Sequence, residues 1–123
     1  MEVLACQEIF SNAERGEIRM VWSFMHEDET ILCPFPDRKI EVSRLASLCK
    51  IRLGPEDEIV RVAKSFQKKA TLAPKDAIHL ACASYCNAKF FLTCDEDLIK
   101  KSKRLKLGLT VLNPVDYVRQ EVL

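Results

Sequence analysis

The chain has 123 residues, of which 48% are hydrophobic and 30% charged, a balance that is ordinary for a globular protein with one hydrophobic core. Its 19 basic and 18 acidic residues give a net charge of +1, which excludes a global field that would draw the whole chain to nucleic acid or to a membrane. No apolar run is long enough to span a bilayer, and no signal peptide opens the sequence. We therefore expect a cytoplasmic protein with no membrane contact, forming a single domain over residues 1–123.

Helix and strand patterns alternate along the chain. The first half predicts a helix over residues 2–14, a strand over 18–22, an acidic segment over 24–30 with Ser23 as N-cap, a helix over 37–48 and a strand over 49–53. The second half predicts helices over 54–70, 74–87 and 95–106, strands over 89–93 and 109–112, and a last helix from Pro114. This alternation favours an α/β fold with a mostly parallel sheet covered on both faces.

The six cysteines form no Cys-x-x-Cys pair, and the two histidines are not spaced with them as zinc ligands. Cys82 and Cys86 lie one helical turn apart, so a soft metal is one alternative for them. The other is that all six are thiols packed as small hydrophobes in a reducing compartment, which we favour.

Acidic residues stand where α/β folds gather ligands, at a helix start and just beyond strand ends. Asp76 falls in the first turn of the helix that begins at Pro74, Asp95 follows the strand over 89–93, and the acids at 27–29 follow the strand over 18–22. If these positions share one edge of a parallel sheet, their mutual repulsion favours binding of Mg²⁺ or Mn²⁺. Such an ion activates water and stabilises a phosphoryl group in transfer. The alternative is that each carboxylate only stabilises a helix N-terminus.

One stretch resembles a known family. Asp76-Ala77-Ile78-His79-Leu80-Ala81, followed by an apolar strand that runs into Thr93-Cys94-Asp95, looks like the second half of a PIN domain. Asn113-Pro114 after the last strand also resembles the end of such chains. PIN domains are small three-layer α/β metal-dependent nucleases, and the resemblance is closest to the toxin ribonuclease of VapC-type toxin–antitoxin pairs. It covers most of the chain and is strongest over residues 74–117.

The resemblance implies a set of catalytic and metal-binding acids. By position these are Glu29, Asp76 and Asp95, with Asp97 as an auxiliary ligand and Glu27 in place of Glu29 if the upstream register differs. Together they would hold the Mg²⁺ or Mn²⁺ that activates water for attack on an RNA phosphodiester.

A histidine and a basic run near these acids can each be interpreted in two ways. His79, three residues after Asp76, is either a general base or a packed structural histidine. A basic run on the helix after Asp95 offers phosphate contacts to RNA, or else forms a solvated helix face; its members in the predicted interface are Lys100, Lys101, Lys103 and Arg104.

The sequence departs from the family pattern at its beginning. PIN domains open with a mid-sheet strand that ends in a metal-binding Asp, whereas this sequence opens at Met1-Glu2-Val3-Leu4, which resembles the helix after that strand. We expect an N-terminally truncated PIN-like fold, or a natural start that lies upstream of Met1. Without that strand, neighbouring strand edges are left unpaired and one ligand is missing.

The expected function is metal-dependent endoribonuclease activity in a toxin-like component of a toxin–antitoxin pair, impaired by the missing Asp. The expected partners are RNA, an antitoxin protein and a second copy of the chain. The alternative is a catalytically weakened PIN-like module that acts in dimer or antitoxin binding through exposed apolar residues between Met1 and Ile31. A third reading is a sheet protein without nuclease activity, whose acids only cap helices.

Overall fold

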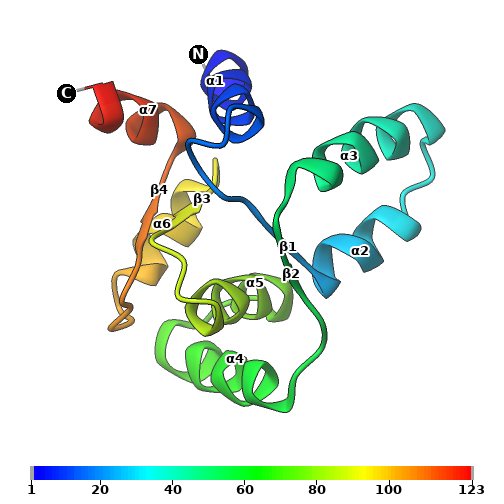
Figure 1. Ribbon diagram of the computed structural model, residues 1–123. Coiled ribbons are helices and arrows are strands. Elements are labelled where there is room, and N and C mark those ends of the chain that lie inside the picture. The colour runs from blue at the N-terminus through cyan, green and yellow to red at the C-terminus, as the bar shows by residue number, and fades with distance from the viewer. Residues whose placement is uncertain (1, 123) are drawn as a thin grey trace.

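The structure, a computed structural model, describes residues 2–122 (Figure 1). Within that range the helices are α1 Glu2–Glu14, α2 Phe24–Ile31, α3 Pro36–Leu48, α4 Asp57–Ala70, α5 Pro74–Tyr85, α6 Glu96–Ser102 and α7 Pro114–Val122. The strands are β1 Val21–Ser23, β2 Ile51–Leu53, β3 Phe90–Leu92 and β4 Thr110–Leu112. This is the α/β alternation that the sequence predicts. Among the helices so described, none combines the length and apolarity needed to cross a bilayer.

The element boundaries differ from the predicted ones in a few places. The strand expected over 18–22 is β1, which begins at Val21 and extends through Ser23. Ser23 is nevertheless the N-cap of α2, as predicted. The helix expected over 95–106 ends at Ser102, whose hydroxyl donates to the carbonyl of Ile99 at 2.7 Å. A hydroxyl that bonds back to the preceding turn competes with the helical ladder, and tight turns carry the chain onward to buried Leu105.

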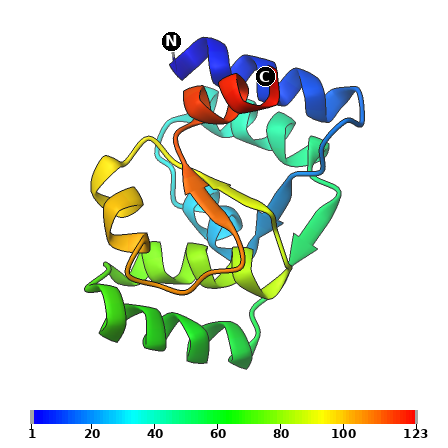
Figure 2. The same ribbon diagram turned by 90° about the vertical axis from the view of Figure 1, so that its left-hand side faces the viewer.

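The strands form two separate sheets rather than the single sheet expected. β1 pairs with β2 and β3 with β4, both in parallel, over three residues each. In both views β1 and β2 run toward the α4–α5 pair, whereas β3 and β4 run away from it, toward α7 (Figure 1 and Figure 2). Strands that run in opposite directions cannot share a parallel ladder. A single central sheet layer is therefore not present in the residues described.

The main hydrophobic core lies where α4 packs against α5. Ile59 of α4 and Leu80 of α5 are fully buried there, and Leu98 of α6 and Leu105 close the cluster. Alanines such as Ala63 and Ala77 let the two helices approach closely, because a small side chain leaves little volume between the backbones. A second, smaller cluster surrounds Trp22, Ala46 and Cys49. The contact between α4 and α5 thus contains the most completely buried side chains among the described residues.

Helix α4 shows why the sequence forms a helix here. Asp57 and Glu58 occupy its first turn and Lys68 and Lys69 its last, which matches the helix dipole. It ends at Thr71, whose backbone is left-handed with φ of 55° and whose N–H donates to the carbonyl of Gln67 at 3.0 Å. A left-handed residue stops the helix and turns the chain into α5.

Candidate functional site

Helices α2 and α5 meet through a cluster of ring side chains that ends in a predicted acid. The indole of Trp22 stacks on the imidazole of His26 with centroids 5.3 Å apart, and the rings of His26 and His79 lie 4.9 Å apart. Nε2 of His79 lies 2.8 Å from Oε1 of Glu29. The histidine cluster, defined by Trp22, His26, His79 and Glu29, therefore joins the end of β1 and α2 to α5.

His26 has a structural role at the start of α2. Its Nδ1 accepts a hydrogen bond from the backbone N–H of Ser23 at 3.0 Å, which satisfies a donor that the first turn of a helix leaves unpaired. Because Nδ1 is an acceptor, the ring is neutral in this arrangement. Burial lowers the pKa of His26, nearby His79 lowers it further, and Glu29 opposes the shift. The neutral ring is thus the form that the fold selects.

His79 is the residue through which α5 meets Glu29. Its side chain is only 18% exposed, whereas that of Glu29 is 45% exposed. A largely buried imidazole needs a hydrogen-bond partner, and the Glu29 carboxylate supplies one. The geometry gives His79 a packed position in which its ring is hydrogen-bonded to Glu29.

Glu27, the substitute for Glu29, points elsewhere. Its Oε2 accepts a hydrogen bond from the indole Nε1 of Trp22 at 2.8 Å. Glu27 lines an open depression of about 240 Å³ together with Asp28 and Arg52. This depression lies at the ends of β1 and β2, the edge of a parallel pair where α/β proteins bind ligands. The acids of the 27–29 segment therefore divide between this depression and α5.

The other two predicted ligands occupy helix starts. Asp76 is half-buried in the first turn of α5, two residues after Pro74. Asp95 is the N-cap of α6, where Oδ1 accepts from the backbone N–H groups of Asp97 at 3.0 Å and Leu98 at 3.1 Å. The helix-capping alternative thus describes what Asp95 does in this structure.

The auxiliary acid and the basic run lie on α6 and its C-terminal turn. Asp97 is exposed and forms an ion pair with Lys101, with Oδ2 and Nζ 3.1 Å apart. Lys100, Lys103 and Arg104 are exposed. This placement suits either of the two readings, a phosphate-binding surface or a solvated helix end.

The predicted metal ligands are not gathered into one cluster in this structure. Carboxylate oxygens are suitable ligands for Mg²⁺ or Mn²⁺, so the donor chemistry of Glu29, Asp76 and Asp95 is appropriate. Across the described part of the chain, however, no three Asp, Glu, His or Cys side chains lie close enough together to hold one ion. The assignment of these acids as metal ligands stays a prediction.

Sequence reasoning missed two features of this region. The ring contacts link Trp22 and His26 to His79, which lies more than 50 positions further along the chain, so no local spacing in the sequence predicts the contact with His79. The basic outer face of α4 was detectable, because Arg61, Lys64 and Lys68 recur at helical spacing.

Comparisons with known proteins identify the family. The family model of the PIN domain matches residues 7–104. No curated protein and no solved structure matches the chain. The α/β alternation and the parallel strand pairs are consistent with a PIN-like fold. Because the match covers well over half of the sequence, the chain belongs to the PIN domain family, which is generally a family of nucleases.

Proposed function

We propose that this chain is an endoribonuclease of the toxin–antitoxin type whose hydrolytic activity is impaired. Family membership supports the nuclease class, and PIN domains typically use Mg²⁺. The observation that carries the proposal is the 2.8 Å contact between His79 and Glu29. It brings one predicted acid against the helix whose first turn carries another, Asp76. Bound Mg²⁺ or Mn²⁺ would supply the activated water.

Two contacts of the predicted ligands support the proposed impairment. Glu29 accepts from His79, and Asp95 accepts two backbone hydrogen bonds at the start of α6. Each carboxylate would have to give up part of these contacts to bind a cation. That cost would lower the affinity of these carboxylates for metal.

The test is Mn²⁺-dependent cleavage of single-stranded RNA by the purified protein and by the Asp76→Asn variant. We expect slow cleavage by the wild type and at least a tenfold further loss in the variant, about the scale seen when groups that support a metal site are removed. Asp116→Asn is the matched control, because Asp116 follows Pro114 in α7 as Asp76 follows Pro74 in α5. It should cleave like the wild type.

Two results would contradict this proposal. One is the absence of wild-type cleavage at every Mg²⁺ and Mn²⁺ concentration. The other is equal cleavage by wild type and Asp76→Asn, which would point to a contaminating nuclease. A thermal unfolding series with added Mn²⁺ supplies a readout besides activity, since an ion that binds the native state raises its stability.

A second candidate function, a PIN module that binds a protein partner without hydrolysis, is favoured by one surface. The large apolar side chains exposed around the α2–α3 connection are Ile31 at 61%, Leu32 at 80%, Phe35 at 53% and Ile40 at 60%. Clustered exposed apolar residues mark protein interfaces. Val3 and Leu4 on α1 are also exposed, so most such side chains lie in the first 40 residues.

Light scattering after size-exclusion chromatography tests this second function. If the surface joins two copies of the chain, the wild type should be a dimer and the double variant Leu32→Asp with Ile40→Asp a monomer. Val60→Asp introduces the same charge at an exposed apolar position on α4 and should leave the dimer intact. A monomeric wild type at high concentration would refute self-association through this surface.

A further inference from the structure

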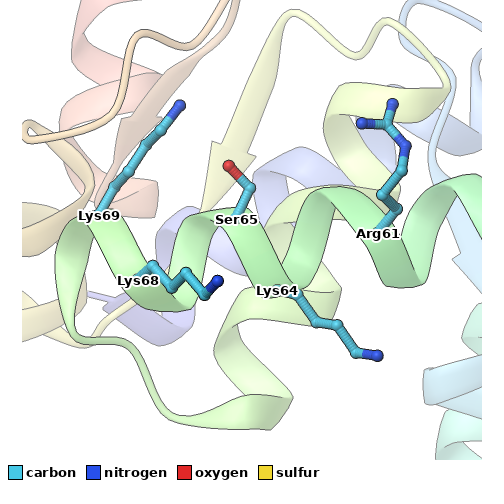
Figure 3. Close-up of a pocket in the computed structure, with 5 residues that line it drawn as sticks. All are labelled: Arg61, Lys64, Ser65, Lys68 and Lys69. Atoms are coloured by element: carbon cyan, nitrogen blue, oxygen red, sulfur yellow. The ribbon is translucent and has the colours of Figure 1, made fainter.

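The outer face of α4 carries a dense group of cations around a shallow depression of about 340 Å³. This depression is lined by Arg61, Lys64, Ser65, Lys68 and Lys69 (Figure 3). We propose that this α4 basic face, defined by those five residues, binds the phosphate backbone of single-stranded RNA. It is a second nucleic-acid surface, on a different helix from the basic run of α6.

The amphipathic sequence of α4 creates this face. Ile59, Ala63 and Ala70 are buried against the core, which fixes the rotation of the helix and turns its basic residues to solvent. Arg61, Ser65 and Lys69 follow one another at intervals of four residues and extend to the same side in Figure 3. Lys64 and Lys68 form a second row on the front of the helix.

Few carboxylates offset the charge of this face. Arg61 pairs with Glu58 one turn earlier. Within the described residues, Lys64, Lys68 and Lys69 have no ion pair with any acid. The whole chain has a net charge of only +1, so this concentration of positive charge is local and must be compensated elsewhere on the molecule. Local cation clusters of this kind attract polyanions.

The chemistry of the lining favours phosphate over an acidic peptide. Lys, Arg and Ser are among the side chains that contact phosphate oxygens in nucleic-acid complexes. The eight helical steps from Arg61 to Lys69 span about 12 Å of helix axis, enough for contacts to more than one phosphate of an extended strand. No apolar or aromatic residue lines the depression, so it offers neither a pocket to anchor a peptide side chain nor a stacking platform for bases. Binding should therefore depend on the backbone and not on the base sequence.

The experiment measures binding of a labelled oligouridine of about 20 nucleotides, long enough to cover the site sizes common for single strands. EDTA is present throughout, so that neither cleavage nor metal contributes. The α4 variant replaces Lys64, Lys68 and Lys69 by Ala. The control variant also loses three exposed cations, through Arg19→Ala, Lys50→Ala and Lys89→Ala. Alanine is favourable at exposed helix positions, so the α4 variant should keep its helix. A melting curve checks that both variants fold.

We expect the α4 variant to bind oligouridine several-fold more weakly than the control variant at low salt. Its plot of log affinity against log salt should be shallower than that of the wild type by about 2, because each lost contact to a single strand removes about 0.7 from the slope. Equal affinities and slopes for the two variants would overturn the proposal. So would an oligoglutamate peptide that binds wild type as tightly as RNA and with the same dependence on Lys64, Lys68 and Lys69.

This inference does not depend on the proposed catalysis. An inactive wild type that shows the expected binding would refute the nuclease proposal alone. If the wild type cleaves RNA but the α4 variant binds RNA as tightly as the control variant, this proposal alone would be refuted.

Discussion

The carboxylate of Asp95 accepts hydrogen bonds from two backbone N–H groups, those of Asp97 and Leu98, so it stabilises the start of α6 whatever else it binds. Thr93 supports the same turn, because its hydroxyl accepts from the backbone N–H of Asp95 at 3.1 Å. The capping role of Asp95 is therefore present in the fold, and the predicted metal-binding role would have to use the same side chain. Substitutions at Asp95 can separate them.

Asp95→Ala should lower the free energy of unfolding by about 1 kcal/mol, the usual cost of losing an N-cap side chain. Asp95→Asn should leave stability nearly unchanged, because Asn caps helices as well as Asp does. Denaturant unfolding measures both effects. If Asp95 also binds a cation, the Asn variant alone would combine normal stability with lost cleavage. Equal stability of the Ala variant and the wild type would contradict the capping role.

Protonation of His26 should weaken the fold. The neutral ring accepts the Ser23 N–H, and burial with neighbouring His79 lowers the pKa of His26, while Glu29 opposes that change. A lowered pKa means that the unfolded chain binds the proton more readily than the native one. The free energy of unfolding should therefore fall as pH drops below about 6.5, the ordinary pKa of histidine, toward the lower native value.

Unfolding by denaturant across this pH range tests the effect, with His26→Gln as the comparison. Gln is a favourable third residue for a capping box and does not titrate, so it keeps the acceptor for Ser23 and removes the proton. The variant should show a weaker loss of stability on acidification than the wild type. Identical pH profiles would rule out His26 as the source.

At the scale of elements, α4 shows how one helix serves both the core and the surface. Its buried residues fasten it to α5, its charged ends match the helix dipole, and its outer face carries the cations. The connection to α5 is short and depends on Thr71, which adopts a left-handed conformation with φ of 55°. A β-branched residue is unfavourable there, since its Cβ crowds the following carbonyl.

Thr71→Gly should raise the free energy of unfolding by about 1 kcal/mol, because glycine adopts this conformation without the steric penalty. Thr110→Gly is the matched control: Thr110 lies in β4, where its φ is not positive, and glycine should destabilise the strand. Thermal or denaturant unfolding compares the two. A loss of stability in Thr71→Gly would contradict this prediction. It would show that contacts of the Thr71 side chain stabilise the fold by more than the left-handed conformation costs.

At the scale of the whole molecule, stability should depend mainly on the α4–α5 core. Leu80→Ala should cost about 2–5 kcal/mol, the usual range for removing a fully buried Leu side chain. Val60→Ala, at a position 42% exposed on the same helix pair, should change stability by less than about 0.5 kcal/mol. Denaturant midpoints measured together check the contrast. A small effect at Leu80 would mean that this core is not packed as described.

The predicted elements of the sequence are largely those of the structure because their signals are local. Pro74 and Pro114 open helices, Ser23 caps one, and charged residues match the ends of α4. Such signals act within one turn of chain, so periodicity and capping residues reveal them without knowledge of the fold. The limits of the strands could not be predicted as closely from the sequence. A strand of three residues begins and ends where its partner strand pairs with it, and the partner lies far away in the sequence.

What the sequence determined by itself was the α/β alternation and the PIN resemblance, which the family match bears out. Only the tertiary structure decided which side chains meet. In the folded chain Glu29 contacts His79 and Asp95 caps the start of α6. The strands form two sheets, and the cations of α4 face solvent. The physical reason is that capping and periodicity fix each element along the chain, whereas the directions of the two sheets set the distances between elements.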